Sequence, residues 1–234
     1  MPRPWLGRAV VQQSAETGLA GLQAHRRRPQ ARDGALIYLV RHGETVWNQA
    51  GRQQGRLDSP LTPNGVEQAR AAGRFLRTIL PEGLDVVLET SPLGRARATA
   101  ELIAAELTLP VADIRSSPLL MEHALGAWEG LTYAEIDDRF PGARQAREAD
   151  KWRYVIDGGE SYALASQRAR RWLAGCTAAL TVAVTHEMMS RAIQGAYASL
   201  SPAETLARSH PHDRLYRLDS GEIASMELAP PAVW

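Results

Sequence analysis

The sequence predicts an α/β fold of three layers, in which helices flank a mainly parallel sheet that carries an antiparallel edge near the C-terminus. Three observations lead to this prediction. From residue 35 onward, short apolar runs alternate with longer segments of helical periodicity, which is the order expected of parallel strands with right-handed crossovers. The apolar runs end abruptly at polar residues. The last two runs are joined by Ser220-Gly221, which is typical of a hairpin.

The first expected strand covers residues 35–40 and leads directly into Arg41 and His42. A polar, glycine-bearing loop is expected over residues 48–60. Thr62 and Pro63 then supply an N-cap and a first-turn proline, and helical spacing continues as far as Pro81. The chain therefore returns through a helix before the next strand.

A second strand is expected over residues 84–90, and it also ends at a turn, Ser91-Pro92. The helix that follows carries Arg95 in its first turn, close to the end of this strand. Residues 111–114 are expected to form a third strand. The first two expected strands thus both end at a turn that carries polar side chains.

Residues 132–152 are charged and helical in tendency, with a break at Pro141-Gly142, and we expect them to cover a site rather than to join the core. Ser161 can cap the next helix. A buried strand at 180–185 ends at His186.

A helix follows the 180–185 strand from about residue 187 to 200, with apolar side chains at helical spacing. Runs at 214–218 and 223–228 are expected to pair as the hairpin of the antiparallel edge.

Composition limits the class of protein. A chain of 234 residues suits one well-buried domain, which we place at residues 35–234. The net charge of +1 argues against a general nucleic-acid surface, and no apolar stretch approaches the ~20 residues of a membrane helix. Cys176 is the only cysteine, so neither a disulfide framework nor a cysteine-rich metal site is expected. These features predict a cytoplasmic setting.

Residues 1–34 differ from the rest of the chain. They contain Arg26-Arg27-Arg28, only two acidic residues and little periodicity, so we expect a basic, disordered tail outside the core. An overextended start, a transit segment, and an arm that contacts RNA or membrane are alternative interpretations.

Three expected strands therefore end in Arg41 with His42, in Ser91 with Arg95 just beyond, and in His186. If the strands are neighbours in one parallel sheet, two arginines and two histidines converge at one edge of it. Arginine binds phosphate oxygens bidentately, and a neutral imidazole is a nucleophile. The sequence thus predicts a cationic site of the size of a phosphate group.

Five blocks of the chain resemble the histidine phosphatase superfamily, which includes the cofactor-dependent phosphoglycerate mutases. Arg-His-Gly alone would be a weak signal, but five blocks in order are a strong one, and the similarity spans about residues 36–228. The blocks are 39–45 (LVRHGET) continuing through Trp47-Asn48 and Gln54-Gly55 to 58–65 (DSPLTPNG), 91–96 with Thr99-Ala100, Glu122 with Gly126 and 128–131 (WEGL), 159–161 (GES), and 184–186 (VTH).

The resemblance implies a role for each of five residues. His42 is expected to attack phosphorus and to form a phosphohistidine, while Arg41 and Arg95 hold the nonbridging oxygens. His186 is expected to contact the same phosphoryl group. Glu122 is expected to protonate the leaving alkoxide and then to deprotonate water. No metal and no cofactor are expected.

Four further residues are expected to bind the substrate. The amide of Gly43 and the side chain of Asn48 are plausible phosphate contacts, and Gln54 with Gly55 is expected to line the approach. Trp47 and Trp128 either shape the pocket or pack in the core.

Several other assignments remain open. Glu129 and Glu44 compete with Glu122 for the acid role, and His123 beside it is expected at the surface. His210 and His212 lack a nearby acidic cluster, so no metal site is proposed there.

The chain also departs from the family pattern. Glu187 stands where many members have glycine, and a carboxylate there should weaken phosphate binding unless it pairs, for instance with Arg191 at i+4. The segment 161–180 is short, which puts the placement of His186 in question.

The function expected from these residues is hydrolysis of a phosphomonoester on a small metabolite. Mutase-type phosphoryl transfer is an alternative, although the stretch from Glu122 to Gly159 lacks a long lysine-bearing insertion. A weakly active domain that binds a phosphorylated ligand is a third. The sequence defines neither the substrate nor the oligomeric state.

Overall fold

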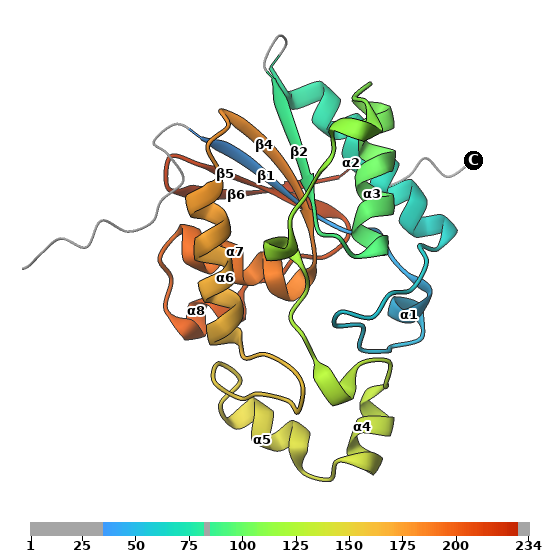
Figure 1. The fold of residues 1–234 in the computed structure, drawn as a ribbon, viewed down its shortest axis with the longest axis vertical. Coiled ribbons are helices and arrows are strands. Elements are labelled where there is room, and N and C mark those ends of the chain that lie inside the picture. The colour runs from blue at the N-terminus through green and yellow to red at the C-terminus, as the bar shows by residue number, and fades with distance from the viewer. Residues whose placement is uncertain (1–34, 82–84, 229–234) are drawn as a thin grey trace, which may run out of the picture.

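The computed structural model describes residues 35–81 and 85–228, so the expected tail at 1–34 lies outside the described residues. Its centre is a six-stranded sheet of order β3-β2-β4-β1-β5-β6 (Figure 1). The strands are β1 (Leu36–Arg41), β2 (Val86–Thr90), β3 (Arg115–Ser116), β4 (Leu180–Thr185), β5 (Arg214–Asp219) and β6 (Glu222–Glu227). β1, β2, β3 and β4 run parallel, and β5 and β6 form the antiparallel edge. The expected fold class is confirmed.

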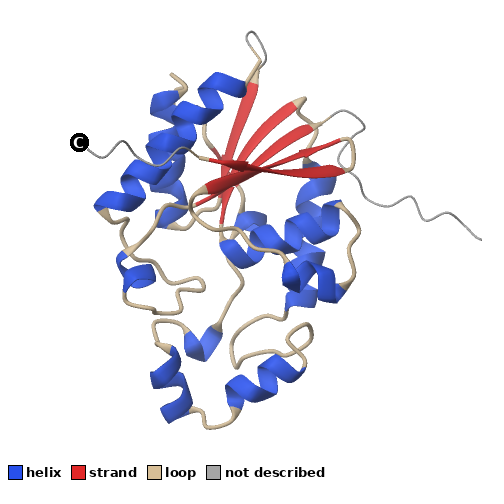
Figure 2. Cartoon of the chain, turned by 180° about the vertical axis from the view of Figure 1, so that it is seen from behind, coloured by secondary structure: helices blue, strands red, loops and turns tan. Residues whose placement is uncertain are grey.

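Helices cover both faces of this sheet (Figure 2). One apolar cluster joins α2 and α3 to β1, β2 and β4, and a second joins α6 and α7 to the opposite face. Each layer thus packs on one side of the sheet, as in three-layer α/β folds. The helices are α1 (Val46–Gln49), α2 (Pro63–Ile79), α3 (Gly94–Glu106), α4 (Tyr133–Arg139), α5 (Ala143–Ala149), α6 (Tyr162–Gly175), α7 (Glu187–Tyr197) and α8 (Pro202–Ala207).

The register of the central strands decides where the site lies. β4 is buried along its whole length between β1 and β2. Arg41 is opposite Thr185 across β1 and β4, and Thr90 is opposite Val184 across β2 and β4. The residues that follow these strands therefore leave the sheet at one edge. The short 161–180 segment has not shifted β4 out of register.

Local sequence signals explain several helix boundaries. Thr62 caps α2 through its hydroxyl, with Pro63 at the first helical position, and Ser161 caps α6 in the same way. α4 and α5 are separated at Gly142, whose φ of 78° suits glycine. The hairpin turn has positive φ at both Ser220 and Gly221, which matches the twist of paired antiparallel strands.

The prediction of a strand at 111–114 was wrong. Val111–Asp113 is a 3₁₀ helix. The edge strand β3 begins two residues later and contains only Arg115 and Ser116. Val111 is 51% exposed, and of this run only Ile114 packs against the core, so the run lacks the buried face that a strand would need. Two short helices, α1 and α8, were not anticipated, and α1 begins just before the expected 48–60 loop.

Residues 132–152 form a separate cover, as expected, from α4, α5 and the turn that follows. Beneath them lies a small apolar cluster made by Leu125, Trp128, Ile136 and Ile156. Figure 1 shows α4 and α5 well apart from the sheet, beyond the ends of its central strands. Among residues 35–81 and 85–228, no helix is both long enough and apolar enough to cross a bilayer.

Candidate active site

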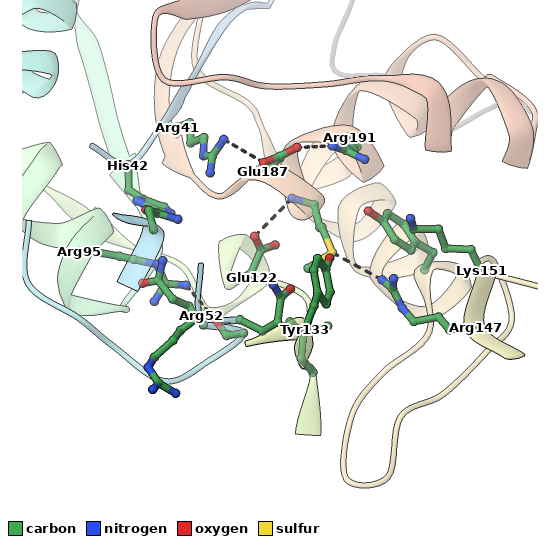
Figure 3. A pocket seen from close by; sticks show the side chains of 17 residues that line it. Arg41, His42, Arg52, Arg95, Glu122, Tyr133, Arg147, Lys151, Glu187 and Arg191 are labelled. Atoms are coloured by element: carbon green, nitrogen blue, oxygen red, sulfur yellow. Dashed lines mark hydrogen bonds and ion pairs between the residues drawn. The ribbon is translucent and has the colours of Figure 1, made fainter. Parts of the chain in front are cut away.

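A pocket lies at the carboxyl ends of the parallel strands, between the sheet and the cover (Figure 3). Its lining includes Arg41, His42 and Arg95 from the sheet side, and Tyr133, Arg147 and Lys151 from the cover, along with Glu122 between them. In open α/β folds, ligands bind in the crevice at this end of the strands.

His42 is held as a neutral base. Its ring nitrogen Nδ1 lies 2.8 Å from the carbonyl oxygen of Gly43, and because a carbonyl only accepts, Nδ1 carries the proton and Nε2 keeps its lone pair. Burial lowers the pKa of His42 well below its usual value, and the charges of Arg95 and Arg41 lower it further. The imidazole therefore stays neutral, with the tautomer that a nucleophile at Nε2 requires.

His186 lies beside His42, with 5.1 Å between the ring centroids. Its side chain is fully buried, and in the described part of the chain neither ring nitrogen has a hydrogen-bond partner. Burial, followed by the charge of Arg95, lowers its pKa well below the usual value. Buried polar atoms normally have partners. The structure therefore places an unpartnered imidazole beside His42, although His186 is not among the residues that line the pocket.

Arg95 is fixed by the loop that follows α1. Its Nη1 donates to the carbonyl of Leu57 at 2.7 Å and to the Asp58 carboxylate at 3.1 Å, and its Nη2 donates to the carbonyl of Gly55 at 2.7 Å. The side chain is 1% exposed. These bonds hold the guanidinium rigidly in the wall of the pocket.

Arg41 has different partners. Its Nη1 donates to the carbonyl of His210 at 2.9 Å and lies 2.8 Å from the Glu187 carboxylate. Glu187 also pairs with Arg191, four residues along α7. The pairing with Arg191 that the sequence suggested is confirmed, and the additional pairing with Arg41 was not foreseen.

Glu122 sits at the N-terminus of α7. Its Oε1 accepts the amides of His123 and Met189, both at 2.9 Å, and its Oε2 accepts the amide of Met188 at 3.3 Å. Burial raises the pKa of Glu122, while the three amides and Arg95 act in the opposite direction. Oε2 has the weaker acceptor bond, so it is the oxygen better able to carry a proton.

The competitors of Glu122 are engaged elsewhere. Glu129 accepts the amides of Arg56 and Leu125, and Glu44 accepts the hydroxyl of Thr62. Neither carboxylate belongs to the pocket lining. Glu122 is therefore the carboxylate that the geometry favours as the acid.

The other expected substrate contacts differ in outcome. Asn48, Gln54 and Gly55 line the pocket, although Oδ1 of Asn48 is used to cap α1. Gly43 does not fit the expected contact, because its amide donates to the hydroxyl of Thr99 at 3.0 Å. The need for glycine there is steric, since a Cβ would lie 2.2 Å from the carbonyl of Gly65.

One further expectation needs correction. His123 is not at the surface: it is 1% exposed, its ring centroid lies 5.0 Å from that of Tyr162, and burial lowers its pKa to about 3. The sequence left two roles open for Trp47 and Trp128, pocket or packing. Neither lines the pocket, and Trp128 packs in the cluster under the cover.

The histidines near the C-terminal hairpin do not gather acidic ligands. His210 is buried and contacts the Ser190 hydroxyl at 2.6 Å, while the His212 ring lies 5.8 Å from that of His42. No group of three potential metal ligands occurs among the described residues.

The comparisons with known proteins agree with this geometry. A family model described as the histidine phosphatase superfamily, branch 1, matches residues 37–223. The chain belongs to this superfamily. Residues 37–223 run from β1 to the first two residues of β6 and therefore cover almost the whole sheet except most of β6.

Two curated relatives of this histidine phosphatase carry different names. A probable phosphoglycerate mutase, GpmB, of Serratia proteamaculans is 37% identical over 60% of this chain and 62% of its own. A glucosyl-3-phosphoglycerate phosphatase of Mycolicibacterium vanbaalenii is 39% identical over 53% of this chain and 52% of its own. This chain thus spans between about half and three fifths of the length of these relatives.

Solved structures match over a larger share. A mycobacterial glucosyl-3-phosphoglycerate phosphatase in complex with VO3 superposes with a TM-score of 0.69 at 28% identity, over 86% of this chain and 98% of that one. A putative α-ribazole-5′-phosphate phosphatase of Escherichia coli gives a TM-score of 0.72 at 22% identity, over 86% and 99% of the two chains. The second match shows the fold alone.

Sequence reasoning missed the residues that support the site. Arg168 of α6 is buried and donates to the carbonyls of Leu119 and Glu122, which fixes the backbone that carries Glu122. Arg147 and Lys151 of the histidine phosphatase cover also went unnoticed. Arg147 belongs to α5 and Lys151 to the turn after it, so no single helical spacing in the sequence marks both.

Proposed function

We propose that this chain is a phosphomonoesterase, which hydrolyses a small phosphorylated metabolite through a phosphohistidine on His42. The observation that carries the proposal is the neutral His42, with Nε2 unprotonated, in a pocket shared with Arg41, Arg95 and Glu122. The phosphatase name of one relative and the VO3 complex of another support the same chemistry.

The first half-reaction breaks the ester. Nε2 of His42 attacks phosphorus, the P–O bond to the leaving group breaks, and protonated Glu122 gives its proton to the departing alkoxide. Arg41 and Arg95 supply fixed positive charge for the phosphoryl oxygens. The raised pKa of Glu122 favours the protonated form that this step needs.

The second half-reaction restores the enzyme. The carboxylate of Glu122 takes a proton from water, the oxygen of that water attacks the phosphohistidine, and the P–N bond breaks to release inorganic phosphate. We expect His186, which lies beside His42 and has no partner for its ring nitrogens in the described chain, to bind the transferring oxygens. In this scheme each proton is accounted for by His42, Glu122 and water, so no metal is required.

The test is a hydrolysis screen of phosphorylated metabolites from acidic to neutral pH, with and without chelator. The proposal predicts release of inorganic phosphate that chelator does not affect and that His42→Ala abolishes. Activity that persists in His42→Ala, or that disappears with chelator, would contradict it.

Phosphoglycerate mutase activity is the second candidate, because several relatives are named probable phosphoglycerate mutases. A mutase would retain the phosphoryl group in an isomerised product, and only when primed with a bisphosphate. Incubation with 3-phosphoglycerate, with and without a bisphosphate primer, followed by separate assays for phosphate and for 2-phosphoglycerate, distinguishes the two. Retention of the phosphoryl group would replace the phosphatase proposal.

A weakly active domain that binds a phosphorylated ligand is favoured by one observation, the Glu187 carboxylate beside Arg41. Such a domain would bind phosphate esters in calorimetry but release none of their phosphate. Turnover that depends on His42 would reject this candidate.

A further inference from the structure

Glu187 places a carboxylate inside the anion site. Its carboxylate oxygens contact Arg41 on one side and Arg191 on the other, and all three side chains line the pocket. In Figure 3, Glu187 lies between the His42 end of the pocket and the end formed by Arg147 and Lys151. A substrate that reaches from one end to the other passes this group.

The ion pair with Glu187 reduces the positive charge and the free Nη1 hydrogen-bond donors that Arg41 can present to a phosphate group. Nη1 of Arg41 already has two acceptors, the His210 carbonyl at 2.9 Å and the Glu187 carboxylate at 2.8 Å. Arg41 is 12% exposed and Glu187 is 30% exposed, so solvent screens their interaction only in part. A phosphoryl group bound to Arg41 is thus repelled by a carboxylate in the same wall.

The carboxylate is held where it is by more than Arg41. Glu187 begins α7, where the helix dipole stabilises negative charge, and Arg191 binds it from the next turn of the same helix. It therefore cannot turn away from the pocket without losing these contacts. A hydroxyl group of a substrate can donate to it, whereas a second anionic group at the same place is repelled.

Resting on the phosphatase function proposed above, we infer that Glu187 is a specificity-determining residue. It weakens the binding of phosphate at Arg41, and it favours esters whose phosphate-bearing carbon is flanked by hydroxyl groups over esters that carry an anionic group there. The first effect speeds the release of inorganic phosphate, and the second sets the substrate class.

The test of the first effect does not depend on turnover. Calorimetric titration with inorganic phosphate compares the wild type with Glu187→Gln, which keeps the shape but removes the charge. The inference predicts binding at least about tenfold tighter in Glu187→Gln, the size expected of one charge pair across a partly screened site. Glu187→Asp, which keeps the charge, should stay close to wild type, as should Glu101→Gln on the exposed face of α3. Unchanged or weaker binding in Glu187→Gln would overturn the inference.

The test of the second effect uses two esters that differ by one group. Glycerol 2-phosphate has hydroxymethyl groups on its phosphate-bearing carbon, and 2-phosphoglycerate has a carboxylate in place of one of them. The wild type should favour glycerol 2-phosphate in kcat/KM, and Glu187→Gln should shift this preference toward 2-phosphoglycerate by about tenfold. An unchanged preference would contradict the inference. Loss of both activities in all variants and in the wild type would instead reject the phosphatase function, while the phosphate titration would still report on Glu187.

Discussion

The pocket has two walls that are built in different ways. The floor, made by Arg41, His42 and Arg95 with His186 packed beside His42, stands at the ends of parallel strands whose register is fixed by a buried sheet. The cover, residues 132–152, consists of two short helices over an apolar cluster of its own. His42, Arg95 and His186 are buried and Arg41 is nearly so, whereas cover ion pairs such as Lys151 with Glu148 are more exposed.

This difference indicates that the floor and the cover have different roles in catalysis and in substrate binding. Groups that are fixed by a sheet can stabilise a developing charge, because they need not reorganise during the reaction. Groups on exposed helices tolerate change, and their charges are screened by water. Substitutions in the floor should therefore reduce kcat, and substitutions in the cover should alter KM.

The largest effect is expected between the two walls, at Glu122. Glu122→Gln should reduce kcat/KM for an alkyl phosphate by about 10² to 10⁴-fold, because the alkoxide then leaves without a proton. The loss in kcat/KM should be much smaller with p-nitrophenyl phosphate, whose leaving group needs no proton. In the wild type, kcat/KM for the alkyl ester should fall as pH rises through the raised pKa of Glu122. The variant should lack this decline. Equal losses in kcat/KM with both esters would exclude Glu122 as the acid, and Glu44→Gln serves as the control.

Arg95→Lys tests the rigidity of the floor. It keeps the charge but loses the fork that binds the carbonyls of Gly55 and Leu57. We expect kcat/KM to fall by about 10² to 10³-fold and the free energy of unfolding to fall by about 1 to 3 kcal/mol. Arg97→Lys, on the exposed side of the same helix, should change neither. Full activity in Arg95→Lys would show that only the charge matters.

His123 lies where floor and cover meet, and it tests how burial couples to pH. The pKa of this histidine is about 6.5 in the unfolded chain and about 3 in the folded chain. Because the unfolded state binds the proton first, His123 contributes stability above pH ~6.5 that is lost as pH falls toward 3. Denaturant titrations should therefore show that His123→Phe loses less stability on acidification, by up to about 1.4 kcal/mol per pH unit in that window. An identical pH dependence in the two proteins would contradict the assigned burial effect.

The smallest effect is expected in the cover. Lys151 lines the pocket and is paired with exposed Glu148. Lys151→Met should raise KM by up to about fivefold, which corresponds to about 1 kcal/mol for one screened contact, and should leave kcat unchanged. Arg153→Met, 82% exposed nearby, is the matched control. A large fall in kcat would mean that the cover takes part in the chemistry.

The floor was more predictable from the sequence than the cover, for physical reasons. A strand end marked by Arg41 and His42, or by His186, is a local pattern, and parallel pairing then brings such ends together. The partners of Glu187 depend on distances between elements far apart in the chain, so only the one within its own helix was foreseen. The same holds for His123, whose burial arises from the packing of α6 against the loop after Leu120.

The 3₁₀ segment Val111–Asp113 shows another limit. Val111 and Ile114, which are β-branched, favour a strand locally, but the sheet edge offers a neighbour only to the residues that follow. The amide of Gly43 was likewise assigned to the substrate because of its place in the block. In the structure this amide donates a hydrogen bond to the hydroxyl of Thr99.

The central claim is that His42 carries the phosphoryl group during turnover. The most direct measurement mixes the enzyme with p-nitrophenyl phosphate, quenches the reaction in denaturant without acid, and maps the modified peptide by mass spectrometry. The account predicts one phosphoryl group on His42, which is lost on brief acid treatment and is absent from His42→Ala. An acid-stable adduct, an adduct on another residue, or turnover by His42→Ala would contradict it.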